Sequence, residues 1–96
     1  MALHLAAIVI GILESTTELK TLLSGMVEQS VQEAACLQYV LYQSDEAPRV
    51  FIFHKLWADE AGLEQHNAQP YIQDFIARSG TLLAQPVQLY KTKAIA

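Results

Sequence analysis

Residues 36–57, CLQYVLYQSDEAPRVFIFHKLW, contain the pattern that decides the fold. Two runs rich in aromatic and β-branched side chains, 36–43 and 49–57, flank the polar segment 44–48. Runs of this composition favour β-strands, and a short polar connection between them favours an antiparallel hairpin. We therefore expect a hairpin in the middle of the chain, with the other elements packed around it.

An apolar strand and an amphipathic helix are expected before this hairpin. Residues 3–13, LHLAAIVIGIL, form a nearly continuous apolar run with the length of a buried strand. Ser15 followed by Glu18 has the spacing of a capping box, which predicts the start of a helix that ends near residues 33–35. The apolar stripe of this helix consists of Leu19, Leu22, Leu23, Met26, Val27 and Val31.

Two helices and a final strand are expected after the hairpin. Asp59 can cap a short helix, and Pro70 suits the first turn of a longer one. The inner stripe of the longer helix would be Ile72, Phe75, Ile76, Ser79 and Leu83, and the last strand would cover residues 87–95. The order β-α-β-β-α-β, with the second helical region interrupted at 67–69, predicts a ferredoxin-like α+β fold. One four-stranded antiparallel sheet then carries the helices on one face, in a single domain of residues 1–96.

The composition points to a partner for this domain. The chain has 96 residues, of which 52% are hydrophobic and 17% charged, so intrinsic disorder is excluded. The first and third expected strands carry apolar side chains on both faces. In the third strand, Val50 and Ile52 on one face alternate with Phe51 and Phe53 on the other. Helices cover only one face of such a sheet, so the other face needs another molecule. We expect a homodimer in which two sheets pack face to face.

Charge and cysteine content exclude several other classes. Six basic and ten acidic residues give 6 − 10 = −4, and no basic cluster exceeds residues 91–93, so no nucleic-acid partner is expected. The single cysteine, Cys36, excludes an internal disulfide and fits a reducing cytoplasm. The N-terminus lacks the basic region of a signal peptide, and the apolar run 5–13 is too short to span a bilayer. We expect a soluble, cytoplasmic protein without a membrane partner.

The sequence has no motif for a metal or a cofactor. His4, His54 and His66 lie on different expected elements without metal-ligand spacing, so no metal is expected. The four glycines stand alone, and a nucleophile elbow is absent. Any chemistry is therefore expected to use no cofactor.

The best candidate for a functional site is the segment 57–75, WADEAGLEQHNAQPYIQDF. It places Trp57 at the end of a strand, His66 one short helix later and Tyr71 just inside the next helix. Strand ends and helix starts meet at one rim of such a fold, so these side chains could line one apolar pocket. The residues below them would come from Tyr39, Tyr42, Phe51 and Phe53.

Each of these candidates also has a structural interpretation. Trp57 could be a core residue, His66 a surface or capping histidine, and Tyr71 a packing residue at a helix start. Cys36 could be a small buried apolar residue, and His54 could lie in the dimer interface.

The segment resembles the signature of the antibiotic biosynthesis monooxygenase family. The similarity lies in Trp57, in His66 nine residues later, and in Pro70 followed by Tyr71. It extends to the chain length, the element order and the 33–36 passage, Glu-Ala-Ala-Cys, where the family commonly has Glu, Gly and Cys.

The resemblance implies a ferredoxin-like subunit, a dimeric α+β barrel and a pocket between sheet and helices. Haem-degrading relatives carry a histidine in the second long helix, where this chain has 75–78, Phe-Ile-Ala-Arg, so haem chemistry is disfavoured. Many relatives carry a glutamate two residues before the strand-end aromatic, where this chain has Lys55.

Three functions follow as hypotheses. The first is a cofactor-independent monooxygenase that oxidises a small electron-rich phenol, hydroquinone or polyketide-like aromatic with dioxygen. His66 would act as base and Tyr71 would orient the substrate, while Trp57, Phe53 and Tyr39 would bind it. The second is an isomerase or small-molecule-binding module on the same fold. The third is a non-catalytic dimeric domain.

Overall fold

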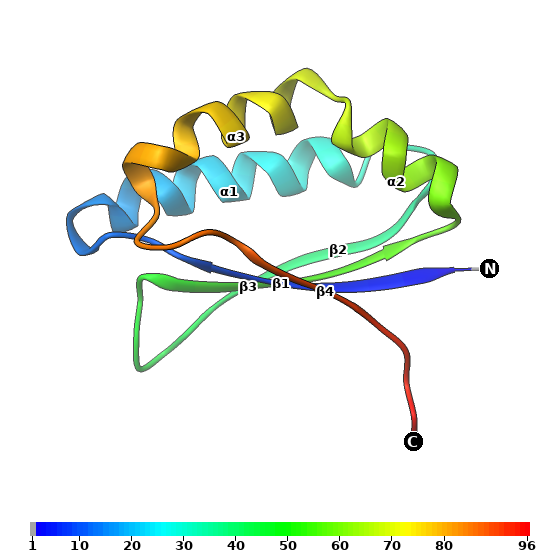
Figure 1. The fold of residues 1–96 in the computed structure, drawn as a ribbon, viewed down its shortest axis with the longest axis horizontal. Helices are drawn as coiled ribbons and strands as arrows, with labels where there is room; N and C mark the ends of the chain where they lie inside the picture. The colour runs from blue at the N-terminus through cyan, green and yellow to red at the C-terminus, as the bar shows by residue number, and fades with distance from the viewer. Residues whose placement is uncertain (1) are drawn as a thin grey trace.

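A four-stranded antiparallel sheet with the strand order β2-β3-β1-β4 carries all the helices on one face (Figure 1). A computed structural model describes residues 2–96 of the chain. Its elements are β1 (Leu3–Ile10), η1 (Leu13–Ser15), α1 (Thr16–Ser30), β2 (Cys36–Gln43), β3 (Val50–Trp57), α2 (Glu60–Asn67), α3 (Pro70–Leu82) and β4 (Gln88–Thr92). The ferredoxin-like fold expected from the sequence, with its divided second helical region, is confirmed.

The sheet face under the helices forms the core. Because side chains alternate along a strand, every second residue of β1 and β3 points towards the helices. The buried side chains of this face are Leu5, Ala7 and Val9 on β1, Tyr39 on β2, and Phe51, Phe53 and Trp57 on β3. Leu19, Leu23 and Met26 of α1 cover them together with Ile72, Phe75 and Leu82 of α3.

The opposite face of the sheet is uncovered within the described residues (Figure 1). Ile8 of β1 pairs with Ile52 of β3, and Ala6 pairs with His54. Tyr42 of β2 is also paired with Ile52 and stacks edge-on against His54, with ring centroids 5.6 Å apart. Tyr42 therefore lies on the face away from the helices, which removes it from the candidate pocket.

Three details near the first helix differ from expectation. β1 ends at Ile10 rather than at residue 13, because Gly11 forms only an isolated bridge with Leu83 and the short helix η1 begins at Leu13. Ser15 occupies the N-cap position of α1, but its side chain makes no capping bond. The hydroxyl of Thr16 instead donates to the carbonyl of Leu13, so the expected capping box is absent.

The later boundaries also need correction. α1 ends at Ser30, and residues 31–35 form tight turns in which the N–H of Glu33 donates to the carbonyl of Ser30. Ile76 is 56% exposed, because α3 buries only a narrow stripe against its neighbours and residue 76 falls on its outer side. The last strand covers only Gln88–Thr92, within the expected residues 87–95.

Candidate functional site

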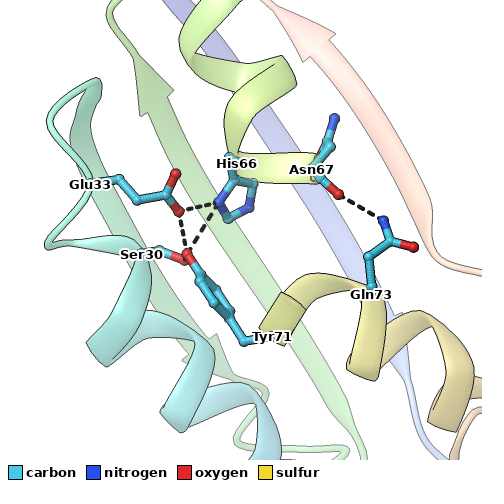
Figure 2. A network of polar contacts seen from close by, with 6 residues as sticks. All are labelled: Ser30, Glu33, His66, Asn67, Tyr71 and Gln73. Carbon is cyan, nitrogen blue, oxygen red and sulfur yellow. Dashed lines mark hydrogen bonds and ion pairs between the residues drawn. The ribbon is translucent and has the colours of Figure 1, made fainter. Parts of the chain in front are cut away.

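The turn after α1, the end of α2 and the start of α3 meet at one end of the helical layer (Figure 2). Asp59 caps α2, since its side chain accepts a hydrogen bond from the N–H of Gly62 at 2.8 Å. A Cβ atom at Gly62 would lie 2.3 Å from the Cβ of Ala35, so only glycine permits this approach. The N–H of Ala58 donates to the carbonyl of Ala35 at 2.8 Å, which holds the turn against the end of β3. This packing brings His66 of α2 next to the residues that follow α1.

The centre of the site is a carboxylate that accepts two hydrogen bonds (Figure 2). The Nδ1–H of His66 donates to Oε2 of Glu33 at 2.8 Å. The hydroxyl of Tyr71 donates to the same oxygen, and Oγ of Ser30 lies 3.2 Å from that hydroxyl. Because the proton of Tyr71 is directed at Glu33, the hydroxyl of Ser30 is the donor to Tyr71. These bonds assign the Nδ1-protonated tautomer to His66 and leave Nε2 as a hydrogen-bond acceptor.

Aromatic rings surround the imidazole of His66, which is only 2% exposed. Its centroid lies 4.4 Å from the ring of Trp57, 5.6 Å from Tyr39 and 6.0 Å from Tyr71. Phe53 joins the cluster through Tyr39, with ring centroids 5.3 Å apart. The structure therefore brings together the five residues to which the monooxygenase hypothesis gives a role, but not Tyr42.

Two buried donors in this cluster have no partner at normal hydrogen-bond distance among residues 2–96, although the hydroxyl of Ser30 lies near enough to Tyr39 to oppose the rise in its pKa that burial causes. They are the hydroxyl of Tyr39 and the indole Nε1–H of Trp57. Leaving such a group unpaired costs about 1–3 kcal/mol, so unpaired buried donors are uncommon in folded proteins. Their presence around His66 distinguishes this region from an ordinary packed core.

Lys55 of β3 also points into the helix-facing side of the sheet. It pairs with Leu5 on one side and Tyr39 on the other, between the buried residues Phe53 and Trp57. Its Nζ atom lies 5.2 Å from the ring centroid of Tyr39 and 4.9 Å from that of Phe53. Within the described part of the chain, Lys55 forms no ion pair.

The surroundings shift the pKa values of these groups. Burial lowers the pKa of His66; hydrogen bonding to Glu33 opposes this effect, and the charge of Lys55 adds to it. Burial and the bond to Glu33 raise the pKa of Tyr71 to about 12. Burial lowers the pKa of Lys55 to about 8. At neutral pH the site therefore combines a neutral imidazole, a protonated tyrosine and a lysine that is still mostly charged.

Two clefts reach the cluster from outside. The first has a volume of 300 Å³ and leads to Glu33 and Tyr71, and the second has a volume of 340 Å³ and leads to Tyr39 between α1 and β2. The first is lined by Gln29, Gln32, Glu33, Gln69, Pro70 and Tyr71. Trp57 and His66 line neither cleft, so the open pocket expected beside Trp57 is filled by side chains.

Sequence reasoning from the residues missed Ser30 and Glu33. The resemblance includes the 33–36 passage, but the helical pattern places residues 33–35 at the end of the helix and gives Glu33 no role in the site. The available signal was an acidic residue directly between a helix and a strand. Across residues 2–96, no three His, Cys, Asp or Glu side chains come together as metal ligands. None of the helices described has the length and apolar character of a membrane span.

Comparisons with known proteins show relatives in sequence and in fold. An uncharacterized protein of Synechocystis sp. is 33% identical over 67 residues, which cover 68% of this chain but only 46% of that protein. "Putative monooxygenase YcnE" of Bacillus subtilis is 29% identical over 69 residues, which cover 72% of this chain and 73% of the relative. The crystal structure of PA3566 from Pseudomonas aeruginosa superimposes with a TM-score of 0.92 at 29% identity, covering 99% of this chain and 95% of that one.

A family model described as antibiotic biosynthesis monooxygenase matches residues 14–78. The matched segment runs from the start of α1 into α3 and contains Ser30, Glu33, Trp57, His66 and Tyr71. It spans more than half of the chain and includes the whole hydrogen-bonded network. The chain therefore belongs to the antibiotic biosynthesis monooxygenase family.

Proposed function

We propose that this protein is a cofactor-independent monooxygenase that oxidises a small electron-rich phenol or hydroquinone with dioxygen. The observation that carries the proposal is the hydrogen bond of 2.8 Å from His66 to Glu33. It orients the imidazole with Nε2 as the basic atom, among the rings of Trp57 and Tyr39. A carboxylate that holds a histidine in one tautomer also stabilises the imidazolium formed when the histidine takes a proton.

In the proposed reaction, Nε2 of His66 removes a proton from a substrate hydroxyl. The resulting anion transfers electrons to dioxygen, and a carbon–oxygen bond forms at a ring carbon. The O–O bond then breaks, so that one oxygen atom stays on the product and the other leaves as water. A hydroquinone with a free ring position thereby gives a hydroxyquinone and water, and all four electrons that dioxygen requires come from the substrate.

The aromatic side chains have supporting roles in this proposal. Trp57 and Phe53 provide apolar walls for the substrate ring, and the hydroxyl of Tyr39 is available to a substrate oxygen. Tyr71, with its pKa raised to about 12, stays protonated and acts by holding Glu33 in place. We infer that the substrate approaches through the clefts beside Tyr71 and Tyr39 and displaces side chains of the ligand-free core.

The test is oxygen uptake with menadiol in chelator-treated buffer, corrected for spontaneous oxidation. We expect uptake by the wild-type protein, formation of the hydroxylated quinone, and loss of about 100-fold or more in His66→Ala. Gln65→Ala, at an exposed position of α2 next to His66 in the sequence, serves as the control. Equal rates in wild type and His66→Ala would exclude His66 as the base.

The filled core favours a second candidate function, a non-catalytic dimeric domain. Trp57 is fully buried and lines neither of the two clefts near the cluster. In that case His66 and Tyr71 would serve only to join α2 and α3 to the turn after α1. No oxygen uptake and no ligand-induced change in the fluorescence of Trp57, the single tryptophan, would favour this candidate.

We also propose that the protein is a homodimer joined through the uncovered face of the sheet. The support is the aliphatic surface around the Ile8–Ile52 pair, which no described element covers. Sedimentation of the wild type at micromolar concentration should give a dimer, and Ile8→Glu should give a monomer. Ile76→Glu, at an exposed position on α3, should remain dimeric. A wild-type monomer would refute the proposal.

A further inference from the structure

Lys55 is a charged side chain that the proposed reaction leaves without a role. It extends from the helix-facing side of β3 into a region whose other side chains are aromatic or apolar. The residues paired with Lys55 on the two neighbouring strands are Leu5 and Tyr39, which are 1% and 3% exposed. Lys55 itself is half-buried, and a lysine in such surroundings usually has a paired anion, because its charge is otherwise poorly solvated.

The rings near Lys55 compensate for only part of this cost. Nζ lies about 5 Å from the centroids of Tyr39 and Phe53, within the range of cation–π attraction. The carboxylate of Glu33 is already engaged by His66 and Tyr71. Among residues 2–96, no carboxylate lies within ion-pair distance of Lys55.

Two donors of the same aromatic cluster also lack a normal hydrogen bond. The hydroxyl of Tyr39 and the indole N–H of Trp57 have no partner at hydrogen-bond distance within the described chain, although the hydroxyl of Ser30 lies near that of Tyr39, and the two rings are 6.2 Å apart. Both residues adjoin His66, which donates its only ring proton to Glu33. The cluster around the imidazole thus contains a cation without a carboxylate partner and two donors without a normal hydrogen bond.

Resting on the proposed function, we propose that Lys55 is a specificity-determining residue and that the site takes an aromatic ligand with an anionic oxygen. An aryl carboxylate or phenolate oxygen would accept from the ammonium of Lys55 and from one of the neighbouring donors. The aromatic ring would lie against Trp57 and Phe53. A glutamate at this position would repel the same oxygen. Among phenols and hydroquinones, the site should therefore favour those that carry an anionic oxygen over neutral ones such as menadiol.

The test measures binding rather than turnover, so that it is independent of oxygen chemistry. The probes are 1-hydroxy-2-naphthoate, which is anionic at pH 7, and 1-naphthol, which is neutral. Binding is followed under nitrogen by quenching of Trp57 fluorescence, because the chain has a single tryptophan. We expect the wild type to bind the anionic probe at least 10-fold more tightly than the neutral one.

Three variants assign this preference to Lys55. Lys55→Met removes the charge but keeps an unbranched side chain one atom shorter, and it should abolish the preference. Lys55→Arg should retain the preference, and Lys55→Glu should reverse it. Lys91→Met is the matched control, since Lys91 is also paired with Leu5 but is solvent-exposed. Circular dichroism verifies that each variant is folded.

The outcomes separate this inference from the proposed function. An equal preference in wild type and Lys55→Met, or no binding of either probe by the wild type, would overturn the role of Lys55. A Lys55-dependent preference without oxygen uptake from any phenol would support the inference and refute the monooxygenase. Oxygen uptake from neutral quinols that is unchanged in Lys55→Met, with no preference between the probes, would support the monooxygenase and overturn the role of Lys55.

Discussion

Replacing Glu33 by glutamine tests whether the carboxylate determines the tautomer of His66. Glu33→Gln keeps the size of the side chain and removes its charge. In the wild type, one oxygen of Glu33 accepts from Nδ1–H of His66 at 2.8 Å and from the hydroxyl of Tyr71. A glutamine amide can instead donate to Nδ1, which would move the imidazole proton to Nε2 and remove the basic atom from the proposed reaction.

The expected loss of stability in Glu33→Gln comes from two hydrogen bonds whose acceptor loses its charge. A hydrogen bond to a charged group contributes about 1 kcal/mol more than one between neutral groups, so the two together amount to about 2 kcal/mol. Screening by solvent is weak here, because the side chains of His66 and Glu33 are only 3% and 14% exposed. For a domain of this size, a loss of about 2 kcal/mol lowers Tm by about 10 °C. Activity should fall by about 100-fold.

The decisive measurement is nitrogen NMR of histidine-labelled protein at pH 7. The wild type should show a protonated Nδ1 and an unprotonated Nε2 for His66, and Glu33→Gln should show a mixture or the reverse. Glu28→Gln, on the exposed face of α1, is the matched control and should change neither tautomer nor Tm. The same tautomer and the same Tm in wild type and Glu33→Gln would refute the role assigned to Glu33.

The pH dependence of stability provides a second readout of the same change. The folded-state pKa of His66 is lower than its ordinary value of 6.5. Below about pH 6.5, His66 therefore binds a proton more readily in the unfolded chain than in the folded protein, and the free energy of unfolding falls. Glu33 raises the pKa of His66, so its removal should make this loss between pH 7 and pH 5 larger. Urea denaturation across this range measures the slope.

Two further substitutions test the packing and the charge of the site. Gly62→Ala should destabilise the fold by about 1–3 kcal/mol in urea denaturation, because the added Cβ would meet that of Ala35 at 2.3 Å. Gly25→Ala, where an added Cβ meets nothing within 4 Å, should be neutral or stabilising; an equal loss in both variants would contradict the close packing of α2. Lys55→Met should raise the free energy of unfolding at pH 7 by an amount on the order of 2 kcal/mol, because it removes a charge whose pKa burial lowers to about 8. Because the folded-state pKa of Lys55 lies below the ordinary 10.5, the difference in unfolding free energy between Lys55→Met and the wild type should shrink as the pH rises from 8 to 10. A difference that does not change with pH would refute this explanation.

The sequence by itself was sufficient for the architecture. Apolar runs of strand length, the cap at Asp59 and Pro70 at a helix start are local signals, and they predicted the order of elements that is observed. The same signals identified Trp57, His66 and Tyr71, because strand ends and helix starts share one rim in this fold. The helix start at Ser15 was predicted correctly, but its capping bond was not, because the hydroxyl of Thr16 bonds to Leu13 instead. The end of the helix near Glu33 was wrong, because the exact last residue of a helix is weakly specified by sequence.

Only the tertiary structure decided which face of each strand meets the helices. Strands with apolar residues on both parities carry no periodic signal, so the sequence left Tyr39 and Tyr42 equivalent. The register of β2 against β3 puts Tyr39 inside with Lys55, and Tyr42 outside with His54. The hydrogen bond between Glu33 and His66 likewise joins residues 33 positions apart in the sequence. They meet because Gly62 lets α2 approach the turn after α1. Local sequence signals therefore determine the helices and strands that carry these residues, whereas long-range packing brings the residues together into one site.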